Sequence, residues 1–501
     1  MSMFRNLMIR ATESGPDTFA CKIKNTDSEA VTPYIAFPVR SAYAYLPAIT
    51  ATIETSSGQR QTLTITGTDL TTKNDTASFA LGRIDYFSAV SMAQDETATV
   101  TLYSKSKQFP SFSFCSSTDG YHWGKANARL CEVNTPLPVF VDGFCGSVFV
   151  GSLLTSLPGN LFQYGGSIKE LNYTFAYSSL VTVPADLFNG MSKVTKVFYL
   201  FRYSDKLTTL PEGLFSGMPE VTNLSYCFSG CSALTSVPEG LFDGVTKVTN
   251  LHNLFGNCSS LVTVPERLFS GMSEVTNLSY CLNSCDALTS VPAGLFNGMT
   301  KVTNLYGLFM GCRSLTTVPA GLFDDMTEVT DLGAMFWNCT SLTSVPEGLF
   351  DGMTKVTSMS TMFVSCYKLT TVPAGLFDDM TEVTRLDRMF IYCTGLTSVP
   401  EGLFRNLTKA NNFAQCFYQV QASAIHPNIF CDEATEKATR FANVTPNFTS
   451  CFDGLKGTVT GTAPALWEYT YKSTPTKTKC FSGNSATTLS NYGDIPTEWI
   501  T

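Results

Sequence analysis

Few residues of this chain have the types and spacing that acid–base, nucleophilic or metal chemistry requires. The three histidines lie far apart, at His122, His252 and His426. Paired carboxylates occur at Asp324–Asp325 and Asp378–Asp379, but two carboxylates supply too few oxygens for calcium, and exposed turns are the favoured interpretation. No Ser–His–Asp set or phosphate-binding loop can be assembled. We therefore predict no catalytic residue, no metal site and no cofactor, in a protein that is not an enzyme.

The 17 cysteines do not have the spacing of a zinc site, because no paired C-x-x-C sites occur. Seven of them recur every 27 residues, at Cys231, Cys258, Cys285, Cys312, Cys339, Cys366 and Cys393. Cys227, Cys281 and Cys416 share a second column with Leu254 and Met362. A residue type that exchanges with Leu and Met acts as a small buried hydrophobe. Neighbours in a column could reach disulfide geometry, but seven in a row offer no unique pairing, so we predict packed free thiols.

The cysteines belong to an internal repeat. Ten prolines from Pro184 to Pro427 are spaced by 27 residues, and Pro158 precedes the first of them by 26. The unit reads L-T-[ST]-V-P-[AE]-G-L-F-x-[GD]-M-[TS]-[KE]-V-T-N-L-x-x-[LM]-F-x-x-C. One such unit cannot bury its own apolar face, so successive units must stack. The sequence therefore predicts a repeat solenoid.

Each unit divides into two similar halves. Each half begins with a strand-like piece rich in Val and Thr and continues into an apolar pair such as Leu322–Phe323 or Met335–Phe336. Proline directly after the strand ends it, because proline has no N–H for the next ladder bond. We therefore predict short strands plus helical turns, which makes the solenoid mixed α/β.

A charged position of the unit alternates in sign without exception. Its occupants are Lys193, Glu220, Lys247, Glu274, Lys301, Glu328, Lys355, Glu382 and Lys409. In stacked units these side chains become vertical neighbours roughly 5 Å apart, where like charges repel and opposite charges attract. The alternative explanation is the copying of a 54-residue doublet with no energetic meaning.

The two ends of the chain differ from the repeat. The segments TFACKIKN, RQTLTITGT and TATVTLYSKS alternate at period two between turn residues, which is typical of an antiparallel β-sandwich-like domain. After Pro427 the register breaks, and we expect Cys451–Phe452 to be equivalent to Cys416–Phe417. The predicted divisions are the N-terminal β domain at 1–107, a junction and N-terminal cap at 108–150, a solenoid of about eleven 27-residue repeats at 151–463, and a C-terminal cap at 464–501.

Composition argues against two classes of partner. The net charge of −8 and the pI near 5.1, without clustered Lys and Arg, predict no nucleic-acid binding. No stretch approaches 18 apolar residues, so we predict no membrane insertion. The start of the chain lacks the apolar region of a secretory signal, so we expect either a protein used without export or a processed form.

The repeat resembles a known family. LTSVPEGLFDGMTKVTSM (342–359) resembles typical extracellular leucine-rich repeats, and the M-F-x-x-C-x-x-L-T part is similar to the BspA-like leucine-rich surface proteins of gut and oral bacteria. In VTNLYGLFMGC (302–312) the apolar spacing is more helical than the strand of that family. The resemblance covers roughly residues 150–465. It implies adhesion or the binding of proteins and glycans, not catalysis, and similar repeats occur in bacteriophage host-attachment proteins.

The positions that vary between units are free to build a binding surface, since stacking already explains the invariant ones. In units 292–400 they carry large side chains of the types found in interfaces. The candidate ligand-binding residues are Tyr306, Met310, Arg313, Trp337, Tyr367, Arg385, Arg388, Ile391 and Tyr392.

Together these patterns favour a non-enzymatic attachment protein that binds a protein or a surface glycan. One hypothesis is a phage virion component, a fibre or host-attachment protein, mounted through its N-terminal domain, which docks on another structural protein or self-associates. The alternative is a bacterial cell-surface adhesin of the BspA-like type whose signal was removed, and a glycan-active enzyme is a distant third. The expected location is the particle surface or the bacterial cell surface.

Overall fold

The computed structural model describes most of the chain beyond residue 148 and separate segments before it. The described residues are 18–25, 34–38, 49–65, 83–87, 97–104, 108–109, 128–133, 136–137, 139–140, 145, 148–431, 434–457 and 459–501. The chain divides into two compact units. The first is Met1–Asn223 with Leu241–Val245, and the second is Leu224–Gly240 with Thr246–Thr501.

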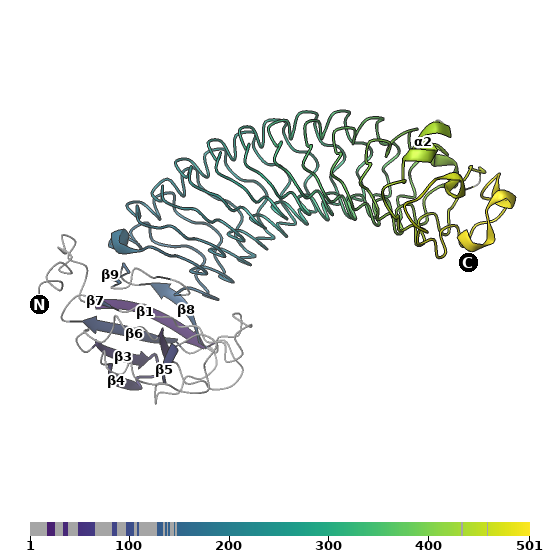
Figure 1. Ribbon diagram of the computed structural model, residues 1–501. Coiled ribbons are helices and arrows are strands. Elements are labelled where there is room, and N and C mark those ends of the chain that lie inside the picture. Colours follow the sequence, from purple (N-terminus) through teal and green to yellow (C-terminus); the bar gives the residue numbers. More distant parts are fainter. Residues whose placement is uncertain are drawn as a thin grey trace, which may run out of the picture. The chain divides into compact units, whose positions relative to one another are not determined.

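The N-terminal region contains an antiparallel sheet of five strands in the order β4-β3-β6-β1-β8 (Figure 1). The strands are β1 (Thr18–Asn25), β3 (Ile49–Thr55), β4 (Arg60–Ile65), β6 (Thr97–Ser104) and β8 (Ala128–Val133). Burial alternates along β3, with Ala51 and Ile53 inaccessible to solvent. The period-two pattern of the sequence is thereby confirmed as an antiparallel sheet with one buried face.

Two smaller pairings accompany this sheet. Strands β2 (Tyr34–Pro38) and β5 (Arg83–Phe87) pair antiparallel, and β7 (Gln108–Phe109) and β9 (Val139–Phe140) form a short parallel pair. Strand β8 lies beyond residue 107, so the five-stranded sheet takes its edge strand from the segment that the sequence assigns to a junction. The predicted sandwich packing and domain bounds stay predictions.

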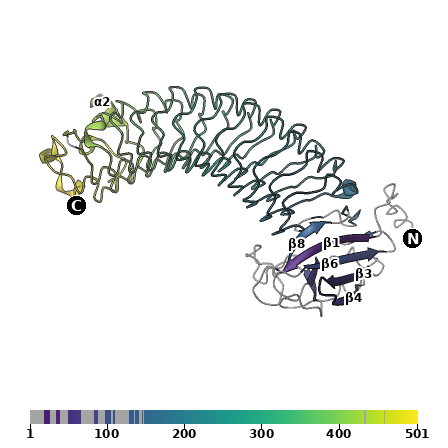
Figure 2. The same cartoon turned by 180° about the vertical axis from the view of Figure 1, so that it is seen from behind.

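Within each unit, from residue 148 on, the chain runs in coils that lie beside their neighbours (Figures 1 and 2). Successive coils of the second unit meet through single parallel bridges, such as Asn277 with Asn304, Asn304 with Asp331, and Asp331 with Ser358. The sequence predicted short strands and helical turns here. Between residues 148 and 421 the described coils instead contain bridges, β-turns and one 3-10 turn, η3 (Gly165–Ser167), and neither an extended strand nor an α-helix.

The turns explain why a strand does not form. Leu254 N–H donates to the carbonyl of Leu251, and Cys258 N–H donates to the carbonyl of Phe255. Within each of these turns one residue is left-handed, with φ of 55° at Asn253 and 61° at Asn257. A positive φ at the third residue is the requirement of a type II turn. The helix-like apolar spacing of the sequence therefore reflects two consecutive turns in every coil.

We call the surface formed by these turns the turn face. In the second unit it comprises residues 250–257, 277–284, 304–311, 331–338, 358–365, 385–392 and 412–419. N–H groups that do not close a turn donate to the next coil, as Asn253 does to the carbonyl of Ser279 at 2.9 Å. Each coil is thus hydrogen-bonded to its neighbour along the whole turn face.

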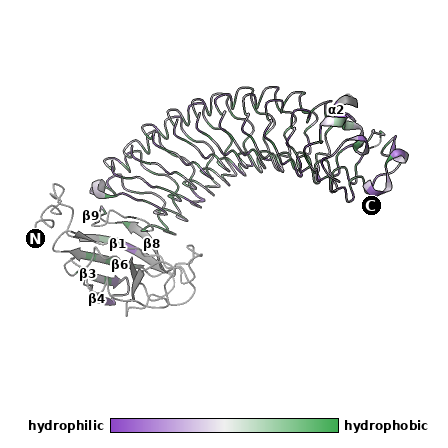
Figure 3. Ribbon diagram, viewed as in Figure 1, coloured by the Kyte–Doolittle hydropathy of each residue, from purple (hydrophilic) through white to green (hydrophobic). Residues whose placement is uncertain are grey.

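Two columns of phenylalanine fill the interior, and Figure 3 shows hydrophobic residues recurring in coil after coil. Beneath the turn face the rings from Phe309 to Phe417 stack at 5.3 to 5.9 Å. In the second column the rings from Phe296 to Phe404 stack at 6.0 to 6.4 Å. Because the first column is spaced more closely, the coils of this unit converge toward the turn face.

The cysteine column is buried, as predicted. Its seven members are inaccessible to solvent and form no disulfide. The Sγ of Cys312 donates to the carbonyl of Leu282 at 3.1 Å, and the Sγ of Cys339 donates to that of Phe309 at the same distance. Burial raises the pKa of the Cys258 and Cys312 thiols to about 12. Each of the six thiols from Cys258 to Cys393 therefore donates to a carbonyl of the preceding coil while filling space as a small apolar group.

The charged edge of the coils is built from alternating links. Glutamates bond the lysine of the next coil in the pairs Glu274–Lys301 at 2.7 Å, Glu328–Lys355 at 2.6 Å and Glu382–Lys409 at 2.5 Å. Across the interfaces between these pairs, an aspartate accepts a glycine N–H instead, from Gly298 to Asp325 at 2.7 Å and from Gly352 to Asp379 at 2.8 Å.

This arrangement corrects the expectation of a continuous row of attractions. Lys355 bonds Glu328 rather than Glu382, since each acidic residue reaches only the lysine that follows it. The 54-residue doublet nevertheless has a structural consequence, because its two members supply two different links and each of these coil interfaces receives one.

The C-terminal coils continue the stack beyond an insertion. Phe417 and Phe452 stack at 5.4 Å, which confirms the predicted equivalence of Cys416–Phe417 and Cys451–Phe452. The insertion carries η4 (Ala422–Ala424) and α2 (Ala434–Thr439), and α2 lies at the edge of the coils (Figure 2). The elements that follow are η5 (Leu466–Glu468), η6 (Tyr492–Asp494) and η7 (Thr497–Trp499). Trp499 is 3% exposed and accepts the N–H of Phe481, which covers the last coil.

The packed thiols predict slow labelling and alkaline sensitivity. A thiol reagent should modify the native protein slowly and should react at once after unfolding. An unfolded thiol ionises near pH 8.5, below the folded values near 12, so the stabilisation is complete below pH ~8.5 and is lost as pH rises toward 12. The free energy of unfolding should fall over that range, and Cys312→Ala should cost about 1 kcal/mol at neutral pH. Rapid labelling of the folded chain would contradict the packing.

Candidate binding surface

The structure places most of the predicted ligand-binding residues on or beside the turn face. Trp337 is 37% exposed, Tyr392 39% and Tyr367 47%. The predicted set also includes the exposed Arg313, Arg385 and Arg388 and the half-buried Tyr306 and Met310. Arg313 and Tyr367 directly follow the cysteine column and border the turn face. Ile391 differs from the rest of the set, because this residue is only 8% exposed.

One column of the turn face is apolar over five coils. We call it the apolar row, and it consists of Met310, Trp337, Val364, Ile391 and Tyr418. Backbone hydrogen bonds hold its members in neighbouring coils, as between Gly311 N–H and the carbonyl of Trp337 at 2.7 Å. The same column is occupied by Gly256 and Asn283 before the row and by Asp453 after it. The change in side-chain type is therefore local, and stacking does not require it.

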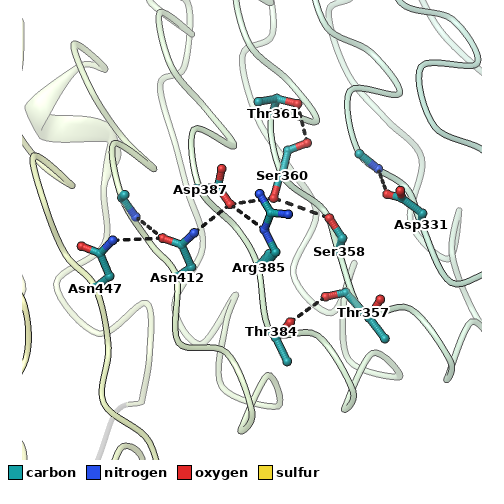
Figure 4. A network of polar contacts seen from close by, with 12 residues as sticks. Asp331, Thr357, Ser358, Ser360, Thr361, Thr384, Arg385, Asp387, Asn412 and Asn447 are labelled. Carbon is teal, nitrogen blue, oxygen red and sulfur yellow. Dashed lines mark hydrogen bonds and ion pairs between the residues drawn. The ribbon is translucent and has the colours of Figure 1, made fainter. Parts of the chain in front are cut away.

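A buried carboxylate organises the polar side chains beside the row (Figure 4). Oδ1 of Asp387 accepts hydrogen bonds from Ser360 Oγ at 2.7 Å, Asn412 Nδ2 at 3.0 Å and Arg385 Nε at 3.3 Å. The Asp387 side chain is 13% exposed whereas that of Arg385 is 57% exposed. Asp387 thus anchors one edge of an arginine whose remaining surface faces solvent.

In other coils a hydrogen bond from a backbone N–H to a nearby side chain takes the place of this network. Asn304 Oδ1 accepts the N–H of Tyr306 at 2.9 Å, and Asp331 Oδ1 accepts that of Gly333 at 2.8 Å, which are local turn-forming bonds. Ser358 and Arg385 occupy the equivalent positions of the next two coils. Because Arg385 has no acceptor atom, it cannot make this bond, and Asp387 ties the coils together instead.

Large side chains also occupy the left-handed positions of the turn face. The backbone φ is 60° at Arg388 and 59° at Tyr392. Three coils earlier the equivalent residues are Gly307 and Gly311. A left-handed residue other than glycine costs about 1–2 kcal/mol, so these side chains oppose stability by their backbone conformation. Residues held in strained backbone conformations are often found at functional sites.

Sequence reasoning missed a second group of large residues in the same two left-handed columns. In the first unit these positions hold Tyr173, Tyr177, Tyr199 and Tyr203, all with φ between 54° and 61°. The signal was present in the sequence, because the columns can be aligned with Tyr392 through the repeat. The positive φ, which marks these tyrosines as unusual, could not be read from residue types.

The histidine of the turn face does not form a nucleophilic pair. His252 contacts Tyr226 Oη through Nε2 at 2.7 Å and Ser279 Oγ through Nδ1 at 2.6 Å. Ser279 Oγ itself donates to Asn277 Oδ1, and its side chain is buried. Burial lowers the pKa of His252. The serine proton is therefore directed away from the imidazole, which makes this chain of groups a structural tie between three coils.

The paired carboxylates act as turn and interface caps. Asp325 and Asp379 accept the glycine N–H bonds of the preceding coil. Within the described part of the chain, no group of three His, Cys, Asp or Glu side chains could hold a metal ion, and no helix is long and apolar enough to cross a bilayer.

Stacked 27-residue coils with a ladder of buried phenylalanines define a leucine-rich-repeat-like solenoid. The chain matches the family model described as "Mycoplasma protein of unknown function, DUF285" at residues 222–345, 270–371 and 303–429, which together cover less than half of it. A comparison with curated proteins gave no match.

Solved structures that are similar to the chain include three repeat proteins. The Toll–Spätzle complex of Drosophila has 16% identity, a TM-score of 0.33, and coverage of 62% of this chain and 42% of that one. The TLR13–ssRNA13 complex has 14% identity, a TM-score of 0.21, and coverage of 57% and 48%. A leucine rich cell surface protein from Faecalibacterium prausnitzii A2-165 has 20% identity, a TM-score of 0.21, and coverage of 51% and 82%. The chain spans less than half of the first two proteins.

Removal of the Asp387 carboxylate should destabilise the coils around it. In Asp387→Ala, Ser360, Arg385 and Asn412 lose a shared acceptor, so the free energy of unfolding should fall by about 1–3 kcal/mol. Denaturant unfolding measures this change. The matched control is Asp351→Ala, an exposed aspartate of the same solenoid that should change stability by less than about 0.5 kcal/mol. Equal losses of unfolding free energy in the two variants would show that the hydrogen bonds to Asp387 do not stabilise the coils.

Proposed function

We propose that this chain is a non-enzymatic attachment protein whose turn face binds a protein ligand. The observation that carries the proposal is the apolar row with exposed Trp337 and its neighbours Arg388 and Tyr392. Interfaces are anchored by a few Trp, Tyr and Arg side chains, surrounded by contacts that exclude water. The row is confined to five coils, so a ligand would be located at one place along the solenoid.

The charge around the row supports a ligand with acidic groups at its margin. Three exposed arginines flank it, but Arg313 pairs with Asp286 at 3.6 Å and Arg385 with Asp387 at 3.3 Å. Arg388 instead donates to the neutral Gln415 at 2.9 Å. The chain as a whole has a net charge of −8, so the charge of Arg388, which has a neutral partner, departs from the average. Charges at a rim contribute mainly to specificity and to the association rate. Val364 and Ile391 of the row are each only 8% exposed. We therefore assign affinity to the exposed Trp337 together with Tyr392, and selectivity to Arg388.

Two settings follow from the proposal. In a virion fibre or host-attachment protein, the N-terminal sheet would dock on another structural protein or self-associate, and the solenoid would extend the binding surface. In a bacterial cell-surface adhesin, the same surface would meet a neighbouring cell. Immunogold labelling of purified particles and of intact cells with an antibody against the solenoid distinguishes the two locations.

Binding should depend on Trp337 and Tyr392 more than stability does. The double variant Trp337→Ala, Tyr392→Ala should weaken adherence of the labelled chain to epithelial or bacterial cells at least tenfold, since each truncated anchor costs about 1–2 kcal/mol. Its melting temperature should stay within a few degrees, because both side chains are exposed. Adherence should also be lost when the cells are treated with a protease, as a protein ligand requires.

The control is Val262→Thr, which replaces another exposed apolar side chain by the residue of most units at that position. This variant should adhere normally. A loss of stability in the double variant that matches the loss of adherence would assign Trp337 and Tyr392 to the core and refute the proposal. Adherence that survives the protease would refute the protein ligand.

A further inference from the structure

The first unit carries a compact cluster of tyrosines around one arginine. The rings of Tyr173 and Tyr199 stack at 4.5 Å with 12° between their planes, and those of Tyr177 and Tyr203 lie 5.2 Å apart. The guanidinium of Arg202 lies 4.9 Å from the Tyr199 ring centre and 4.8 Å from that of Tyr203. The Arg202 guanidinium thus lies between the Tyr173–Tyr199 pair and the Tyr177–Tyr203 pair.

The backbone indicates that this cluster is not needed for stacking. All four tyrosines have a positive φ, a conformation that favours glycine and asparagine. In later coils the position of Tyr203 is held by Asn257, and that of Arg202 is held by Asn283, with the coil geometry unchanged. The solenoid therefore forms equally well without an aromatic cluster at this place.

At neutral pH the polar groups of the cluster are hydrogen-bond donors and a positive charge. Burial, together with the neighbouring Tyr199, raises the pKa of Tyr173 to about 12, so its phenol stays protonated. Burial also raises the pKa of Tyr177, whereas the Arg202 charge lowers it. A guanidinium beside protonated phenols attracts an oxyanion, because a charge-assisted hydrogen bond to a carboxylate is about twice as strong as a neutral one.

We propose that the cluster of Tyr173, Tyr177, Tyr199, Tyr203 and Arg202 binds the carboxylate of an acidic sugar. Arg202 pairs with the carboxylate, and the phenols, which combine an apolar ring with a polar tip, contact the ring and hydroxyls of the sugar. Between residues 148 and 223, Val181 and Tyr203 are the exposed large apolar side chains, which is too few for the anchored core of a protein interface. A small polyhydroxylated anion suits this composition better than an acidic peptide.

The test measures binding of defined acidic sugars to the full chain. The probes are glucuronate, galacturonate and N-acetylneuraminate, with glucose as the neutral control and a tetraglutamate peptide as the competing acid. Saturation-transfer NMR should detect at least one acidic sugar, bound at least tenfold more tightly than glucose and than the peptide.

Variants then assign the binding to this site. Arg202→Asn and Tyr203→Asn introduce the residues that later coils carry, so both should fold with an unchanged melting temperature while losing at least tenfold in affinity for the sugar. The Trp337→Ala, Tyr392→Ala variant should retain the sugar, which keeps this test independent of the turn-face proposal. The inference is overturned if none of the three sugars binds, if glucose or the peptide binds as well, or if the two asparagine variants bind the sugar normally.

Discussion

Hydrogen bonding between neighbouring coils is the constraint on which the rest of this structure depends. A coil made of turns and single bridges satisfies only part of its polar backbone internally, so its other N–H and C=O groups must meet those of the next coil. Thr303 illustrates the density of these links, because its N–H and its hydroxyl both donate to the carbonyl of Thr276, at 2.9 and 3.2 Å. The repeat length can vary only where the register is rebuilt, as it is at the insertion that carries α2.

This constraint separates the residues that make the fold from those that can vary. Interior columns repeat because each side chain contacts the neighbouring coil at the same place, either its own counterpart, as the stacked phenylalanines do, or a backbone carbonyl, as the thiols do. Turn-face side chains project from the left-handed and neighbouring positions, where the backbone bonds are the same whatever the residue. Tyr203 and Asn257 make this plain, since two very different side chains occupy equivalent turns. Binding chemistry can therefore change from coil to coil without loss of the stack.

The sequence predicted those features that depend on residue type and period. The stacking of units, the buried cysteine column and the N-terminal strands around Cys21 and Val100 all follow from apolar spacing. The turns did not follow, because a type II turn is specified by backbone angles and here tolerates Tyr, Arg and Thr where glycine is expected. The pairing of Lys355 with Glu328 could not be predicted either, since alternating charge does not show which neighbouring coil a side chain contacts.

For the candidate binding surface, residue type indicated most of the exposed side chains, but it did not show which side chains converge from neighbouring coils. Trp337 and Tyr392 are exposed as expected, whereas Ile391 is covered within the apolar row. The buried carboxylate of Asp387 was not singled out, because nothing in the local sequence shows that Ser360 and Asn412 converge on it from neighbouring coils. The tyrosines of the first unit lie outside units 292–400, on which the predicted binding surface rests, and residue type alone does not mark them.

The most direct test of the stacking account is the excision of coils in and out of register. Removal of residues 250–303 joins Thr249 to Asn304, restores every column and preserves the Glu–Lys alternation. Thermal unfolding of this variant should remain cooperative, with a melting temperature close to that of the full chain. Removal of 250–302, one residue fewer, shifts every column at the junction and should produce a large loss of stability. If both deletions unfold at the same temperature, register between coils does not hold this solenoid together.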